Sequence, residues 1–282
     1  MITVVGLGKA GCAIADKFSS YPQYTITKVN TGGEGVHKIP RCKTPEEYEK
    51  KAPSFESMLG EVEGKVLFIV DGSEIISACS LRLLYTIRHC QIEIMYIQPD
   101  IQFLSGDRKL NERVVRGILQ EYTRSAMFER MYLVNVPTVA AAIGDIPIKH
   151  YHDRVYEMVT STFHMLNVFA NSEPVISNLH EPVEMAKIST FGLVDPKTNE
   201  EKMFFPLDYP RERYYYYGIN EEKLSTDGSL MGKIKEKISS VARDDMKVSY
   251  AIYETEHGKD FGFVVAHTNA IQQQTLDKLD QE

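Results

Sequence analysis

The stretch that decides the fold is residues 2–11, which read ITVVGLGKAG. A β-branched run at the start predicts a strand over residues 2–5, and apolar residues at helical spacing follow the glycines. Glycines 6, 8 and 11 between a strand and a helix let backbone N–H groups approach an anion at the positive end of the helix. These residues therefore predict a phosphate-binding turn. The alternative is a tight turn that needs its glycines for packing alone.

Strands and helices alternate through the rest of the first half of the chain. The patterns predict strands at 24–29, 65–70, 92–98 and 131–136, and helices at 45–51, 75–88 and 110–126. Such alternation is typical of parallel β-α-β units. The run at 65–70 is almost wholly apolar, which indicates a strand covered on both faces.

The second half of the chain begins with a long amphipathic helix predicted at 150–170. It is followed by strands predicted at 185–193, 202–207, 214–219, 248–254 and 261–266, and by one helix at 229–243. The last two strands are expected to form a hairpin. We therefore predict an α/β fold in three parts: a Rossmann-like parallel-sheet domain at 1–149, a connecting core helix at 150–170, and a smaller α+β domain at 171–282.

Composition excludes several classes of function. The chain has 282 residues and a net charge of −7, which argues against sequence-specific nucleic-acid binding because that requires a basic face. No apolar run is long enough to span a membrane, and the N-terminus has no charged leader before its apolar residues. Four cysteines without CxxC spacing indicate reduced thiols, so a cytoplasmic location is expected.

The histidines do not predict a metal site. His150, His152 and His164 share the long helix but lack the i, i+4 pairing with a third ligand that a zinc site needs. They are interpreted as helix-surface residues, and no metal is expected.

The end of the second predicted strand distinguishes between kinds of nucleotide. A dinucleotide-binding unit places Asp or Glu there to bind the ribose hydroxyls, whereas this strand ends in Asn30-Thr31. This weighs against NAD. A Rossmann-type NAD(P)-dependent oxidoreductase stays as an alternative, in which the glycines hold the pyrophosphate and the acids around Glu181 transfer protons.

In the order of these features the chain resembles the tubulin/FtsZ superfamily over nearly its whole length. The shared features are the glycine turn, the Val29-Asn30-Thr31 strand end, the loop from Gln98 to Arg108, the strand ending in Asn135-Val136-Pro137, the long helix, and the strands between 248 and 266. The resemblance implies a GTP or GDP site, with self-association as the partner interaction. It places phosphates over Gly6, Gly8, Lys9, Gly11 and Gly72, and the sugar and base near Asn30 and Asp153.

Two motifs depart from the family pattern. The glycine-rich loop expected after the strand at 65–70 is replaced by DGSEIISAC at 71–79, where Glu74 would repel a triphosphate and the isoleucines would hinder close approach. The catalytic loop is replaced by NLHEPVE at 178–184. Glu181 and Glu184 keep an acid-x-x-acid spacing that could position a water, and are the candidate catalytic residues. A solvated acidic turn is the alternative.

These departures predict a divergent, pseudo-GTPase member similar to phage and plasmid tubulins. The expected function is a self-associating scaffold or filament with weak or absent GTP hydrolysis. Whether the chain binds GTP, GDP or no nucleotide is left open. A nucleotide-free structural protein that keeps only the fold is a third alternative.

The four tyrosines at 214–217 are unusual in composition. Alternation along a strand places Tyr215 and Tyr217 on one face, where they are predicted to form a subunit interface because tyrosine is enriched there. A strand with half of its rings in the core is the alternative.

Overall fold

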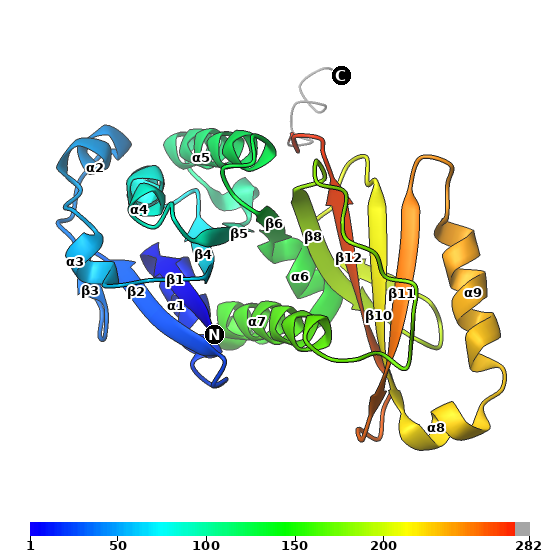
Figure 1. Ribbon diagram of the computed structural model, residues 1–282. Helices are drawn as coiled ribbons and strands as arrows, with labels where there is room; N and C mark the ends of the chain where they lie inside the picture. The colour runs from blue at the N-terminus through cyan, green and yellow to red at the C-terminus, as the bar shows by residue number, and fades with distance from the viewer. Residues whose placement is uncertain (274–282) are drawn as a thin grey trace.

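The computed structural model describes residues 1–273. Its N-terminal half is a sheet with helices on both faces (Figure 1). The elements in chain order are β1 (Ile2–Leu7), α1 (Gly8–Phe18), β2 (Tyr24–Asn30), β3 (His37–Lys38), α2 (Pro45–Lys51), α3 (Glu56–Leu59), β4 (Lys65–Asp71), the 3₁₀ helix η1 (Ile75–Cys79), α4 (Ser80–Thr86), β5 (Gln91–Gln98), η2 (Ile101–Phe103), α5 (Gly106–Arg124) and β6 (Arg130–Asn135).

The C-terminal half begins with the two helices that follow β6. Its elements are α6 (Val136–Ile143), η3 (Ile148–His150), α7 (Tyr151–Ala170), β7 (Ile176–Ser177), β8 (Ile188–Val194), β9 (Glu201–Met203), β10 (Glu212–Asn220), α8 (Glu221–Thr226), α9 (Leu230–Val241), β11 (Lys247–Thr255) and β12 (Phe261–Thr268). The predicted long helix is α7, which lies between the N-terminal strands and the strands from β8 onward (Figure 1).

The N-terminal strands run parallel in the order β3-β2-β1-β4-β5-β6. This confirms the predicted parallel sheet, and the strand order is the one found in Rossmann-type folds. The carboxyl ends of β1, β2 and β4 are adjacent, so the turns that follow these strands meet at one edge of the sheet.

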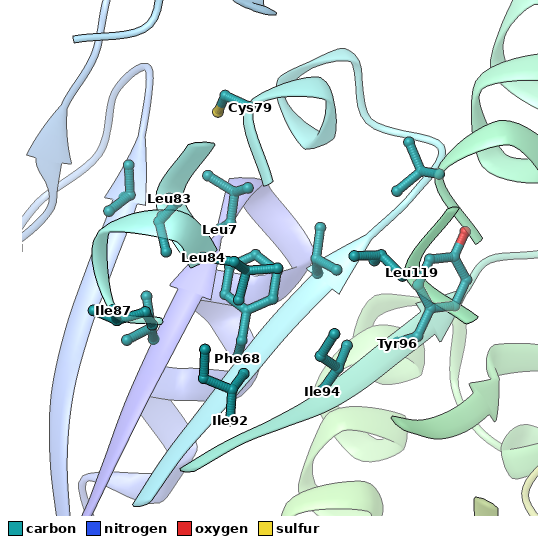
Figure 2. Close-up of a cluster of buried hydrophobic side chains, with 14 of the residues drawn as sticks. Leu7, Phe68, Cys79, Leu83, Leu84, Ile87, Ile92, Ile94, Tyr96 and Leu119 are labelled. Atoms are coloured by element: carbon teal, nitrogen blue, oxygen red, sulfur yellow. The ribbon is translucent and has the colours of Figure 1, made fainter. Parts of the chain in front are cut away.

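The central strand β4 is buried on both faces, as its apolar sequence predicts. Phe68 and Val70 pack in the cluster under α4 and α5, which Figure 2 shows around Leu83, Leu84 and Leu119. Leu67 and Ile69 point to the other face, into the cluster that includes residues of α1 and α7. The core therefore fixes β4 in the middle of the molecule, and with it the loop that starts at its end.

The C-terminal strands continue the same sheet. β6 pairs with β8, and the order proceeds β8-β12-β10-β11-β7. The predicted hairpin of the last two strands is wrong: β12 pairs antiparallel with β8 and β10, while β11 pairs parallel with β10. The physical reason is that α8 and α9 connect β10 to β11, and a helical crossover of this kind joins neighbouring parallel strands.

The burial of Tyr215 and Tyr217 contradicts their predicted role at a subunit interface. Both rings are 0% exposed and pack with Leu230 and Ile234 of α9. The alternation of the strand was predicted correctly, but α9 covers the face that was expected to be open. Elsewhere the main differences are that the helix predicted at 75–88 begins as η1, and that α6 and α8 were not predicted.

Three of the four cysteines, Cys12, Cys42 and Cys79, are buried, and all four are free thiols. Burial raises the pKa of Cys12 and Cys79 to about 12, so both stay protonated at neutral pH. Within residues 1–273, none of the helices has the length and apolar character needed to cross a membrane.

Candidate functional site

The turn between β1 and α1 already holds an anion, which is the carboxylate of Glu74. Its Oε2 accepts a hydrogen bond from the backbone N–H of Lys9 at 2.7 Å, and its Oε1 accepts one from Ala10 at 2.9 Å. Helix α1 has no acidic residue in its first turn, and Leu7 at its N-cap provides no side-chain acceptor. Glu74 therefore fills, from 64–65 residues away in sequence, the position at the helix N-terminus that favours negative charge.

The three glycines of this turn are explained by contacts inside the chain. A Cβ on Gly6 would lie 2.4 Å from the carbonyl oxygen of Gly11, and a Cβ on Gly11 would lie 2.4 Å from the carbonyl oxygen of Ile69. Gly8 has φ of +78°, and a Cβ there would lie 2.3 Å from Oε2 of Glu74. Packing within the chain is therefore enough to explain glycine at all three positions.

Helix α5 holds the loop that carries Glu74. Arg108 donates from Nη2 to the Ser73 hydroxyl at 2.8 Å, and Asn111 donates from Nδ2 to the carbonyl oxygens of Gly72 at 2.7 Å and Glu74 at 3.1 Å. Gly72 packs so closely against Tyr96 that a Cβ would lie 2.0 Å from the phenol oxygen. The loop is thus fixed on two sides, and its conformation directs Glu74 onto α1.

A second carboxyl group, Asp71, lies buried at the start of this loop. Its Oδ1 accepts a hydrogen bond from the backbone N–H of Ser73 at 2.7 Å. Burial, followed by the nearby charge of Glu74, raises the pKa of Asp71 from 3.8 to about 7. The loop after β4 therefore carries two carboxyl groups, Asp71 and Glu74, and the charge of Glu74 contributes to the raised pKa of Asp71.

The raised pKa of Asp71 predicts a pH dependence of stability. Because the folded chain binds this proton more tightly than the unfolded chain, the contribution is complete below pH 3.8 and is lost as the pH rises through about 7. Asp71→Asn keeps a side-chain oxygen that can accept the hydrogen bond from the Ser73 N–H. We expect this variant to show a smaller fall in Tm than the parent chain as the pH rises from about 4 to about 7. The measurement is Tm against pH for both chains. Asp244→Asn in an exposed loop is the control, and equal slopes for Asp71→Asn and the parent chain would contradict the prediction.

The remaining residues predicted to bind nucleotide are engaged within the chain. Lys9 contributes its backbone N–H to Glu74, and its side chain is exposed. Asn30, at the end of β2, accepts a hydrogen bond on Oδ1 from the N–H of Thr31 at 2.8 Å. Asp153 is exposed on α7 and pairs with the Lys17 ammonium at 2.6 Å, a hydrogen bond that lowers the pKa of Asp153.

The candidate catalytic residues Glu181 and Glu184 are exposed in the loop between β7 and β8. Their neighbour His180 anchors this loop to the C-terminal sheet. One ring nitrogen, Nε2, lies 3.1 Å from Oε1 of Glu212, and the other, Nδ1, lies 2.9 Å from the Ser249 hydroxyl.

Glu212 is the buried centre of this anchor. It is 1% exposed, and it also accepts hydrogen bonds from the backbone N–H of Val183 at 2.8 Å and from the Tyr214 hydroxyl at 3.1 Å. Neither Glu212 nor Ser249 was predicted from the sequence. The only local signal was His180 next to two acids. The residues that His180 contacts, Glu212 and Ser249, are 32 and 69 residues away in the sequence.

One histidine prediction is corrected by the structure. His164 is not a surface residue: it is 8% exposed, stacks on Tyr21 with ring centroids 3.7 Å apart, and contacts the Tyr24 hydroxyl at 3.2 Å. Helical spacing alone did not show that the segment before β2 covers this side of α7. Over the described part of the chain, no group of three or more His, Cys, Asp or Glu residues is placed to hold a metal ion.

Comparison with known proteins gives structural likeness without sequence likeness. No family model and no curated protein sequence matches the chain. Among solved structures, the four-stranded filament of TubZ-Bt has a TM-score of 0.76 at 13% identity and covers 99% of this chain and 88% of TubZ-Bt.

Two further solved structures are also similar. GDP-bound CetZ1 from Haloferax volcanii has a TM-score of 0.66 at 13% identity and covers 99% of this chain and 97% of CetZ1. The FtsZ dimer of M. jannaschii has a TM-score of 0.67 at 10% identity and covers 95% of this chain and 88% of FtsZ. These likenesses confirm the resemblance expected from the sequence: the chain has the fold of the tubulin/FtsZ superfamily.

Proposed function

We propose that the chain is a tubulin-like protein that associates with itself into a filament or scaffold, and that it has a degenerate guanine-nucleotide site with weak or absent GTP hydrolysis. The fold supports the self-association, since TubZ-Bt, which shares it, forms filaments. The single observation that carries the degenerate site is the Glu74 carboxylate on the N–H groups of Lys9 and Ala10.

The energetic argument rests on charge. A nucleotide phosphate bound to these N–H groups would have to displace Glu74 and then share the site with its carboxylate. Two unit negative charges 4 Å apart repel by about 4 kcal/mol at the effective dielectric typical of a protein surface. The CetZ1 structure contains GDP. In this chain we expect GTP and GDP to bind weakly or not at all, and self-association to proceed without them.

The loop with Glu181 and Glu184 is proposed as the remnant of a hydrolytic loop. Its carboxylates are exposed and could position a water against a neighbouring copy, but a site without bound phosphate gives them no substrate. We expect the parent chain and Glu181→Ala to release phosphate from GTP at the same background rate. If the parent chain releases phosphate rapidly and Glu181→Ala abolishes that release, the site is not degenerate.

The oxidoreductase alternative is less well supported by the geometry. The pyrophosphate of NAD(P) would need the same N–H groups that Glu74 occupies, and Asn30 replaces the acid expected to bind the ribose. The third alternative, a structural protein that keeps only the fold, shares the nucleotide-free site. A monomer at every protein concentration would remove the filament and leave this third alternative.

Thermal melting separates the oxidoreductase alternative from the other two. The chain is heated alone and with GTP, GDP, NAD or NADP in turn. A ligand at 100 times its dissociation constant stabilises a protein by about 2.7 kcal/mol, so binding raises Tm. We expect no rise with any of the four. A rise with NAD or NADP alone would favour the oxidoreductase, and a large rise with GTP would show that Glu74 yields to phosphate.

A further inference from the structure

The segment 269–273, which follows β12, is held in place by one buried glutamine. Gln272 is 1% exposed and lies beside α5, next to the red end of the chain in Figure 1. Its backbone N–H and C=O and both polar atoms of its side-chain amide all have hydrogen-bond partners. None of the described residues 269–273 belongs to the hydrophobic clusters of the core. Polar contacts therefore hold this segment.

Helix α5 binds the backbone of Gln272. The side-chain amide of Gln120 makes two reciprocal hydrogen bonds with it: Oε1 accepts from the backbone N–H at 2.8 Å, and Nε2 donates to the carbonyl oxygen at 3.3 Å. Nη1 of Arg116 donates to the same carbonyl oxygen. Because Gln120 pairs with both polar groups of one residue's backbone, its amide acts as a neighbouring strand does in a β-ladder.

The loop before β10 binds the side chain of Gln272. Oε1 of Gln272 accepts a hydrogen bond from the backbone N–H of Asp208 at 2.6 Å, and Nε2 donates to the Asp208 carbonyl oxygen at 3.3 Å. Nε2 also donates to the carbonyl oxygen of Ala270 at 3.0 Å. A primary amide supplies both a donor and an acceptor, whereas a carboxylate supplies no donor and an aliphatic side chain supplies neither. The Asp208 backbone therefore selects an amide side chain.

The charges around Gln272 also favour a neutral side chain. The side chain of Arg116 is 3% exposed, and its Nε donates to Oε1 of Glu112 at 2.9 Å. The side chain of Glu112 is 0% exposed, so a carboxylate of the same helix balances the buried cation. A glutamate in place of Gln272 would bring a further charge into a buried position without a new cation, which is unfavourable.

The loop before β10 has a strained backbone next to Asp208. Tyr209 has φ of +52°, a left-handed conformation that residues other than glycine rarely adopt. The hydroxyl group of Thr268, at the end of β12, donates to the Tyr209 carbonyl oxygen at 2.7 Å. Backbone strain that the surroundings maintain is concentrated at binding and catalytic sites. The contact with β12 thus keeps the loop in the conformation that pairs with Gln272.

We propose that Arg116, Gln120 and Asp208 form a binding slot for a glutamine in an extended peptide segment, and that residues 269–273 of the chain itself fill this glutamine slot as a strap. The strap joins α5 to the loop that begins β10. Its release is expected to open this contact locally, while the strands of the sheet stay paired. Neither nucleotide binding nor self-association is needed for the strap to close.

The first test removes the amide and keeps the length of the side chain. In Gln272→Met the Asp208 backbone amide loses its acceptor, so we expect it to exchange with deuterium about tenfold faster than in the parent chain. The Arg211 amide, which donates to the His267 carbonyl oxygen at 2.8 Å, should keep its rate, because β10 and β12 stay paired. Gln273→Met, at an exposed position, is the matched control and should change neither rate. Faster exchange of both amides in Gln272→Met, or of neither, would overturn the inference.

The second test fills the emptied slot from outside. The peptide acetyl-Asn-Ala-Ile-Gln-Gln-amide, which has the sequence of residues 269–273, is added in excess to the full Gln272→Met chain. We expect it to slow the exchange of the Asp208 amide severalfold towards the rate of the parent chain, because its first glutamine supplies the missing acceptor. The peptide acetyl-Asn-Ala-Ile-Met-Gln-amide is the control and should leave the rate unchanged. Equal effects of the two peptides, or no effect of either, would overturn the recognition of glutamine by this slot.

Discussion

Glu74→Ala is expected to lower the stability of the chain and, at the same time, to create a site for phosphate. The variant loses two charge-assisted hydrogen bonds to the first turn of α1, which are worth roughly 2–4 kcal/mol together. For a chain of this size the loss corresponds to a fall in Tm of roughly 4–8 °C. The uncovered N–H groups at the helix N-terminus then become an anion site.

Phosphate or GTP should therefore rescue the variant and leave the parent chain unchanged. The measurement is Tm of both chains with increasing inorganic phosphate, then with GTP, at constant ionic strength. Glu74→Gln is the matched control, because it keeps an acceptor oxygen for one N–H group and still obstructs the site, so its rescue should be smaller. If Glu74→Ala melts with the parent chain, or if phosphate stabilises both equally, Glu74 is not the anion that completes this helix.

Gly11→Ala is expected to destabilise the chain without any rescue by phosphate. The added Cβ would lie 2.4 Å from the carbonyl oxygen of Ile69 in β4, and a backbone atom cannot move aside by changing a rotamer. Overpacking of this kind costs about 3 kcal/mol. Because the clash lies between α1 and β4 and involves no ligand, neither phosphate nor GTP should recover the lost stability.

Gly232→Ala provides the control for this second prediction. Gly232 lies inside α9 and a Cβ there meets no atom within 4 Å, so alanine should leave Tm unchanged or raise it slightly. Urea unfolding of the three chains gives the free-energy differences directly. A Gly11→Ala chain as stable as the parent chain would mean that the glycines are not required for packing, and would return them to a phosphate-binding role.

The sequence was sufficient for much of the fold because local patterns report local structure. The apolar run that became β4 and the spacing that became α7 both identified their elements within one or two residues. The pairing of β11 was mispredicted, since alternation shows that a strand exists without showing which strand lies beside it. Tyr215 and Tyr217 illustrate the same limit. The sequence showed that they share one face of a strand, but it did not show that α9 covers that face.

The sequence identified the two loops that meet at the candidate site, but it did not show how they interact. The glycine turn and the acidic residue in the second loop were both identified, and Glu74 was expected to repel phosphate. That its carboxylate binds the N–H groups of Lys9 and Ala10 depends on how β1 and β4 pair and on how α5 holds the loop through Arg108 and Asn111. Contacts between residues so distant in sequence have no local signature.

Self-association in the absence of nucleotide is the most direct test of the whole interpretation. The chain is stripped of nucleotide, and its sedimentable fraction is measured over a range of concentrations with and without GTP, with electron microscopy of the pellets. Our interpretation predicts the same filaments and the same critical concentration in both series, because the carboxylate on α1 stands where a phosphate otherwise would. A chain that stays monomeric until GTP is added, and then assembles, would contradict it.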